Sequence, residues 1–316
     1  MKDNFGRDIN YLRISITDKC NLRCKYCMPE DGVLKVEHED VMTIEEYIKV
    51  AKVFKGLGIS KVRITGGEPL VKKGVLDLIS GLKEIGIEEI AMTTNGILLS
   101  KMAKDLKEAG LTRVNISLDS LEEKKYKDIT RGGNLQDVFK GIEACKKYGI
   151  APIKINTVVM KDVNIDEFKS FVNLTKDEDL SVRFIELMPI GEAIKYKDKF
   201  ISNDELLEMY PELMPIDSKD ISSPARYYKL PNSKGNIGFI NPMSCKFCGT
   251  CNRVRLTSKG QLLMCLHSNI HIELLKPLRE GKDIEEIIKN SIYNKPETHY
   301  LLEGEYNSTD MNKIGG

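Results

Sequence analysis

The sequence has 316 residues, of which 41% are hydrophobic and 30% are charged, and its formal net charge is +1. A chain of this length and composition folds, and it is long enough for one large α/β domain and a smaller lobe. The near-neutral charge excludes a general attraction to nucleic acid or to a membrane surface, so an anionic ligand must be met by locally placed cations.

Short β-branched runs alternate with longer amphipathic stretches over the first two thirds of the chain. The first amphipathic stretch begins after Thr43, with Glu46 three residues later as a capping box, and ends at Gly58. Strands that alternate with helices predict successive βα units and a parallel sheet. The predicted strands are 11–17, 61–65, 89–93, 113–117, 153–159 and 181–186, and the main predicted helices are 44–57, 75–85, 101–109, 135–148 and 165–175.

Three cysteines follow the first predicted strand in a C-x3-C-x2-C arrangement, at Cys20, Cys24 and Cys27. Thiolates bind soft metal centres, and a cube of four irons held by only three cysteines keeps one iron open for a substrate. The alternative is a zinc site completed from elsewhere, although zinc loops favour C-x2-C pairs.

Several polar or flexible residues stand where predicted strands end. Gly66, Gly67 and Glu68 follow the second strand, Thr93 lies in the third, and Ser117 ends the fourth. Each is also compatible with an ordinary turn. Ligands of parallel α/β sheets gather at the carboxyl ends of the strands, so we expect a site there.

Five basic residues lie on the predicted strands: Arg13, Lys61, Arg63, Lys154 and Arg183. A single basic residue on a strand is usually solvated or paired with a carboxylate. Five on one sheet indicate a polyphosphate site, for which the planar fork of arginine is well suited.

Eight cysteines without a signal-peptide pattern indicate metal binding rather than disulfides. Cys145 stands alone on a helical pattern and is expected in the core, whereas Cys245, Cys248, Cys251 and Cys265 form a second group. Their spacing fits either a zinc ribbon or an iron–sulfur cluster. Ser, Pro, Asn and Gly become frequent over 218–234, which predicts domains at 1–220 and 221–316.

The first cysteine loop and the sequence Gly-Gly-Glu-Pro at 66–69 resemble the radical S-adenosylmethionine (SAM) superfamily. The resemblance implies an incomplete six-stranded (β/α) barrel with a smaller C-terminal lobe, and a [4Fe-4S] cluster on the first three cysteines. It also implies SAM contacts from Tyr26, Gly66, Gly67, Glu68 and Ser117.

The C-terminal sequence Cys-x2-Cys-Asn-Arg-x-Arg-Leu at 248–256, with a further cysteine fourteen residues after Cys251, resembles a narrower family. Its members are the radical SAM enzymes that cyclise GTP in the first step of molybdenum cofactor biosynthesis. The resemblance implies a second [4Fe-4S] cluster on Cys248, Cys251 and Cys265, with Cys245 expected to be a spare thiol. It also implies SAM contact by Met188, an active-site tail ending in Gly315 and Gly316, and GTP contacts from Arg13, Lys61, Arg63, Thr93, Lys154, Arg183, Arg253 and Arg255.

The expected partners are GTP as substrate and a reduced electron donor of the flavodoxin or ferredoxin type, and the resemblance allows a homodimer. No nucleic acid or membrane partner is expected, and we expect a cytoplasmic protein because no stretch approaches the ~20 apolar residues that span a bilayer. Two alternatives are a radical SAM peptide maturase with an auxiliary cluster and a non-catalytic metal-binding scaffold. The four histidines match none of these motifs, and no role is predicted for them.

Overall fold

The computed structural model describes residues 1–33, 37–218, 220, 222–299, 307 and 309–315. Strands and helices alternate up to the end of the sixth strand, which confirms the predicted βα units. In chain order they are β1 (Tyr11–Ser15), α1 (Ile44–Gly56), β2 (Lys61–Thr65), α2 (Val75–Glu84), β3 (Glu89–Thr94), α3 (Leu99–Ala109), β4 (Arg113–Ser117), α4 (Glu123–Thr130), α5 (Leu135–Lys147), β5 (Ile153–Val159), α6 (Phe168–Asp177) and β6 (Ser181–Glu186).

Helix α1 shows how local chemistry fixes these boundaries. The Thr43 hydroxyl accepts a hydrogen bond from the Glu46 amide at 3.3 Å, and the Glu46 carboxylate accepts one from the Thr43 amide at 2.8 Å. This predicted capping box satisfies two amides that the helix itself leaves unpaired. The helix then buries Tyr47 and Phe54 against the sheet side of the core.

Strands β1 to β6 are neighbours in chain order, and every pair among them is parallel. The register places Tyr11 beside Lys61 and Arg13 beside Arg63. Because side chains alternate between the two faces of a strand, the odd-numbered residues of β1 and β2 share one face of the sheet. Lys61 and Arg63, two residues apart on β2, therefore share a face with Tyr11 and Arg13.

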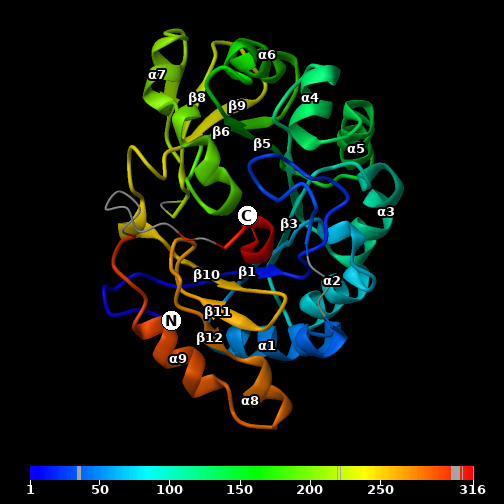
Figure 1. Ribbon diagram of the computed structural model, residues 1–316, viewed down its shortest axis with the longest axis vertical. Helices are drawn as coiled ribbons and strands as arrows, with labels where there is room; N and C mark the ends of the chain where they lie inside the picture. The colour runs from blue at the N-terminus through cyan, green and yellow to red at the C-terminus, as the bar shows by residue number, and fades with distance from the viewer. Residues whose placement is uncertain (34–36, 219, 221, 300–306, 308, 316) are drawn as a thin grey trace.

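The C-terminal part of the chain extends the same sheet at both ends. Strand β9 lies parallel to β6, and β10 lies parallel to β1, so the twelve strands run in the order β12-β11-β10-β1-β2-β3-β4-β5-β6-β9-β8-β7. Figure 1 shows β10 beside β1, and helix α10 in the middle of the molecule. The elements are α7 (Asn203–Glu208), β7 (Met214–Ile216), β8 (Ala225–Lys229), β9 (Asn236–Ile240), β10 (Arg253–Leu256), β11 (Gln261–Leu263), β12 (Ile272–Glu273), α8 (Leu275–Arg279), α9 (Glu285–Tyr293) and α10 (Met311–Ile314), with 3-10 helices η1 (His38–Asp40), η2 (Pro69–Val71), η3 (Ile165–Glu167), η4 (Gly191–Lys199) and η5 (Cys248–Thr250).

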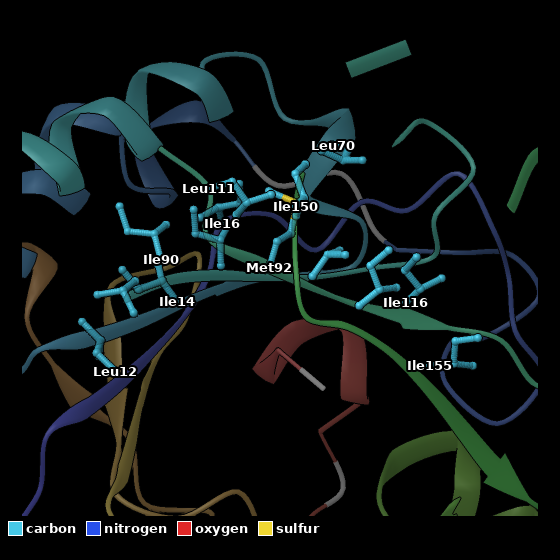
Figure 2. Close-up of a cluster of buried hydrophobic side chains, with 14 of the residues drawn as sticks. Leu12, Ile14, Ile16, Leu70, Ile90, Met92, Leu111, Ile116, Ile150 and Ile155 are labelled. Carbon is cyan, nitrogen blue, oxygen red and sulfur yellow. The ribbon is translucent and has the colours of Figure 1, made fainter. Parts of the chain in front are cut away.

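The main core fills the space between the sheet and its covering helices. Figure 2 shows part of it, with Leu12 and Ile14 from β1 and Ile116 from β4 among the labelled side chains. These three side chains are fully buried, and each contributes about 1.5–3 kcal/mol relative to exposure. Even-numbered residues of β1 to β4 and β6, and odd-numbered residues of β5, therefore face the core, which leaves the alternate residues of each strand for the opposite face. Within the described residues, no helix is both long and apolar enough to cross a membrane.

Candidate active site

One cavity of about 810 Å³ takes in both groups of cysteines and the basic residues of the strands. Its walls carry the odd-numbered side chains of β1 to β4 and β6 and the even-numbered side chains of β5, because register partners on neighbouring strands present their side chains to the same face. The structure brings nearly all of the predicted residues together here. Those that line the cavity are Arg13, Cys20, Cys24, Tyr26, Cys27, Lys61, Arg63, Gly66, Gly67, Thr93, Ser117, Lys154, Arg183, Met188, Cys248, Cys251, Arg253, Arg255 and Cys265.

The first cysteine loop is folded so that its three thiols face one space. The Cys27 amide donates to the Cys24 carbonyl at 2.9 Å, and the Leu22 amide donates to the Cys20 sulfur at 3.3 Å. Burial raises the pKa of all three thiols, for Cys27 to about 12. Three half-buried thiolates need a cationic centre among them. The donor set therefore fits a [4Fe-4S] cluster bound by three cysteines.

The paired glycines pack directly under this loop. The Gly67 amide donates to the Thr17 carbonyl at 2.7 Å, and a Cβ at Gly67 would lie 2.4 Å from the Lys19 carbonyl oxygen. Position 67 therefore admits no side chain while the cysteine loop keeps its place. Gly66 has φ +156° and faces Thr17 in the same way.

Glu68 is buried, and it is absent from the described residues that line the cavity. Its carboxylate accepts hydrogen bonds from the Thr94 hydroxyl at 2.8 Å and from the amides of Asn95 at 2.7 Å and Leu70 at 3.0 Å. Burial raises its pKa to about 7 despite these bonds. In this structure, Glu68 ties the loop after β2 to the end of β3.

Tyr26 lies between Cys24 and Cys27 in the sequence, and the Asp119 carboxylate holds its hydroxyl. Its hydroxyl donates to Asp119 at 2.7 Å, and the other oxygen of Asp119 accepts the Val158 amide at 2.8 Å. Burial raises the pKa of Asp119 to about 6. Asp119 thus fixes the ring of Tyr26 at the cavity wall.

The second group of cysteines lines the same cavity from η5 and from the segment after β11. Burial raises the pKa of Cys265. Burial acts in the same direction on Cys251, but the charges of Lys295 and Arg253 outweigh it and lower the Cys251 pKa. Three thiols near fixed cations again fit an iron–sulfur centre. Cys245 is exposed and is not among the described residues that line the cavity.

The described part of the chain contains no set of three His, Cys, Asp or Glu side chains arranged to hold a single metal ion.

The loop that leads into the second cysteine group is anchored from two directions. The buried carboxylate of Glu186 accepts hydrogen bonds from the amides of Met243 at 2.9 Å and Ser244 at 3.0 Å. The buried guanidinium of Arg7 donates to the Cys248 carbonyl at 2.9 Å and to the Pro296 carbonyl at 2.7 Å. An N-terminal residue thereby fixes a C-terminal cysteine.

The basic side chains are crowded on neighbouring strands. Arg13 stands in register with Arg63 on one side and Arg255 on the other. Burial lowers the pKa of Arg13, and the charges of Arg255 and Arg63 lower it further. Burial likewise lowers the pKa of Lys154 to about 8, with a further contribution from Arg183. Such a concentration of cations is suited to a polyanionic ligand.

The C-terminal tail reaches into this crowded region. The Arg255 guanidinium donates to the Ile314 carbonyl at 3.2 Å and also to the Gly315 carbonyl. A Cβ at Gly315 would lie 2.3 Å from the Thr65 hydroxyl oxygen. Gly315 is therefore packed against β2, whereas Gly316 lies outside the described residues.

Sequence reasoning missed several residues that line the cavity. Tyr11 accepts a hydrogen bond from Arg63, and Tyr227 accepts one from Arg183. The position of Tyr11, two residues before Arg13 on the same strand, could have indicated the shared face. The histidines His267 and His299, for which no role was predicted, also line the cavity with their ring centroids 4.4 Å apart.

Comparison with known proteins matches two family descriptions to this chain. Residues 14–175 match the Radical SAM superfamily, and residues 180–301 match Molybdenum Cofactor Synthesis C. A curated relative from Peptoclostridium acidaminophilum, named GTP 3′,8-cyclase, is 54% identical over 99% of this chain and 98% of its own length. A relative of the same name from Alkaliphilus oremlandii is 52% identical over the whole of both chains.

Among solved structures, the chain is similar to SuiB of Streptococcus suis in complex with its precursor peptide SuiA. The TM-score is 0.61 at 16% sequence identity, and the alignment covers 92% of this chain and 66% of the SuiB chain. At this identity the similarity establishes the α/β radical SAM fold alone.

The fold and the cysteine loop define a radical SAM protein. With relatives above 50% identity over essentially the full length, the chain belongs to the GTP 3′,8-cyclase family of the radical SAM superfamily.

Proposed function

We propose that this chain is a lyase that cyclises GTP to (8S)-3′,8-cyclo-7,8-dihydroguanosine 5′-triphosphate, the first step of molybdenum cofactor biosynthesis. The observation that carries the proposal is that two trios of cysteines and nine lysine or arginine side chains line one cavity. A radical reaction on a polyanionic substrate requires these two features in the same enclosed space. The names of the full-length relatives support the same reaction.

Two [4Fe-4S] clusters and SAM are the cofactors in this proposal. Cys20, Cys24 and Cys27 would hold the first cluster, whose chemistry would be the one-electron cleavage of SAM to methionine and a 5′-deoxyadenosyl radical. The 3′ hydrogen of GTP then moves to the adenosyl carbon, and the ribose 3′ carbon bonds to carbon 8 of guanine. One further electron and one proton complete the product.

The residues of the chain bind and orient both small molecules. We assign SAM to Tyr26, Gly66, Gly67, Ser117 and Met188, which share one cavity with the first cysteines. Tyr26 is oriented by Asp119, and the glycines allow the backbone to approach a ligand closely. Glu68 supports these residues rather than contacting SAM itself, since its carboxylate already accepts hydrogen bonds from the Thr94 hydroxyl and from two amides.

We assign GTP to the second cysteine trio and to a basic strip made of Arg13, Arg63, Arg253 and Arg255. Arg253 and Arg255 extend the strip of Arg13 and Arg63 because β10 pairs with β1. Cys248, Cys251 and Cys265 would hold the second cluster, which would bind the guanine base, while Lys61, Thr93, Lys154 and Arg183 would complete the contacts with ribose and triphosphate. The exposure of Cys245 supports its assignment as a spare thiol.

We also propose how the strands form a barrel and where the chain divides into two parts. Strands β1 to β6 form an incomplete six-stranded (β/α) barrel, and the chain divides near residue 220 into this barrel and a C-terminal lobe. The sequential parallel pairing of the six strands supports the barrel. The antiparallel pairs β8–β9 and β10–β11, both from the part of the chain after residue 220, support the division.

A reduced carrier of the flavodoxin or ferredoxin type delivers the electron in this proposal. A surface hollow on the outer side of the first cysteine loop supports it, because its lining carries four cations, Lys25, Lys124, Lys127 and Arg131, against two carboxylates, Glu30 and Asp128. Basic side chains at this position complement an acidic carrier. The homodimer is proposed on the edge strand β7, where Met214 and Ile216 are exposed, and light scattering of the purified protein tests it.

The test uses protein purified without oxygen, loaded with iron and sulfide and reduced with dithionite. With SAM and GTP we expect cyclised nucleotide, together with 5′-deoxyadenosine that forms only when GTP is present. Iron analysis should give about eight irons per chain for two clusters. Turnover that is indifferent to GTP, or that requires a peptide, would instead support a peptide maturase, and zinc in place of iron would support a metal-binding scaffold.

A further inference from the structure

Four strands carry one row of side chains across the cavity wall, and its last member comes from the C-terminal part of the chain. Asn156 on β5 is in register with Arg183 on β6, Arg183 with Gly238 on β9, and Gly238 with Tyr227 on β8. Register partners on neighbouring strands present their side chains to the same face. Tyr227 therefore faces the cavity in line with two of its polar residues.

Tyr227 reaches two cations of the cavity at once. The Arg183 guanidinium donates a hydrogen bond to the Tyr227 oxygen, and the Lys154 ammonium lies 3.4 Å from the same oxygen. The Arg183 guanidinium carbon and the Lys154 ammonium also stand 5.7 Å and 5.8 Å from the centre of the Tyr227 ring. Oxygen and ring face both offer negative electrostatic potential to a cation.

A glycine makes this contact possible. Gly238 separates Tyr227 from Arg183 in the row, and a Cβ there would lie 3.2 Å from both the Arg183 Cγ and the Tyr227 Cε1. The missing side chain lets the tyrosine ring lean across β9 to the arginine. With any other residue at position 238, the ring or the guanidinium must move.

Among the described residues, neither Lys154 nor Arg183 forms an ion pair with a carboxylate. Burial lowers the pKa of Lys154, and the charge of Arg183 lowers it further. Arg183 is 7% exposed, and its buried Nε has no hydrogen-bond partner within the structure. A buried donor of this kind is costly unless a ligand satisfies it.

We infer that Tyr227 is a positioning residue that holds Lys154 and Arg183 side by side for the triphosphate of the substrate, across the gap left by Gly238. The inference rests on the proposed function. In the free protein the phenol oxygen accepts hydrogen bonds from both cations and opposes their repulsion. When the nucleotide binds, its phosphate oxygens meet a pair of cations that is already in place, including the free Nε of Arg183.

The test compares Tyr227→Phe with Tyr228→Phe. Tyr228 is the matched control because it lies on the same strand with its ring packed edge-to-face on the buried Phe239, at 5.4 Å. Loss of charge-assisted hydrogen bonds from the pair should raise the KM for GTP about tenfold in Tyr227→Phe, with kcat and the KM for SAM changed by less than about twofold. Tyr228→Phe should leave all three constants unchanged.

Inorganic tripolyphosphate and guanosine, used as competitors of GTP, separate the two ends of the substrate. Tyr227→Phe should raise the inhibition constant of tripolyphosphate about tenfold, and that of guanosine by less than about twofold. Gly238→Ala should give the same pattern, although it leaves the phenol intact. Iron content and melting temperature, measured for every variant, show that a weak variant is folded and loaded.

The outcomes separate this inference from the function on which it rests. Wild-type protein without GTP-dependent turnover would overturn the proposed function. Active wild-type protein, together with a Tyr227→Phe variant that binds tripolyphosphate normally or loses guanosine and tripolyphosphate equally, would overturn the role of Tyr227 alone.

Discussion

Replacing Gly315 by alanine should undock the C-terminal tail while leaving the rest of the fold in place. Gly315 has φ +72°, and a Cβ there would lie 2.3 Å from the Thr65 hydroxyl oxygen and 3.2 Å from the Ser15 Cβ. The left-handed conformation costs alanine about 1 kcal/mol. The clash displaces the Gly315 carbonyl from the Arg255 guanidinium, a hydrogen bond to a charged group worth about 2 kcal/mol.

These two effects together cost the docked tail about 3 kcal/mol, which is a factor of more than about 100 in its docking equilibrium. The assay measures cyclised GTP and 5′-deoxyadenosine formed by reduced protein with SAM. If the docked tail supports catalysis, the rate of cyclised product should fall at least about tenfold, while iron content stays at the wild-type value.

Gly281 provides the matched control. It has φ +69°, and nothing lies within 4 Å of a Cβ at that position. Gly281→Ala therefore carries the backbone cost without the clash, and it should lower stability by about 1 kcal/mol with unchanged turnover. A Gly315→Ala enzyme that cyclises GTP at the wild-type rate would refute the reasoning on the tail.

The remaining predictions concern charge and thiols. Because the pKa of Lys154 is lowered to about 8, kcat/KM for GTP should fall as the pH rises through 8, whereas Lys154→Arg should retain its activity to higher pH; identical pH profiles would contradict this. Cys248→Ala should lose about four of about eight irons, and exposed Cys245→Ala should lose none, as iron analysis will show. Arg253→Ala should raise the KM for GTP about tenfold with full iron content; a variant that loses iron instead would indicate a structural role.

Much of the parallel α/β part of the fold could be predicted because it is built from local sequence patterns. The strand from Lys61 to Thr65 and the helix after Thr43 are each encoded within a few residues, by period-2 alternation and by a capping box. Helix α4 (Glu123–Thr130) was not predicted, since most of its residues are charged and few apolar residues recur at helical spacing.

The C-terminal strands could not be placed from sequence, because their pairing depends on contacts across nearly the whole chain. Strand β10 pairs with β1, and this pairing alone sets Arg255 beside Arg13. Tyr227 and Lys295 were missed for the same reason: each reaches the cavity from a segment whose register no local pattern fixes. The hydrogen bonds of Glu68 could not be predicted either, since its partners Thr94 and Asn95 lie at the end of another strand.

The pairing of β1 with β10 has a consequence for how the protein is made. The first strand of the sheet acquires its second neighbour only after residues 253–256 have left the ribosome. Until then β1 presents a bare hydrogen-bonding edge, which invites aggregation of the nascent chain. Expression at reduced temperature or alongside chaperones should therefore raise the soluble yield more than any change to the finished surface.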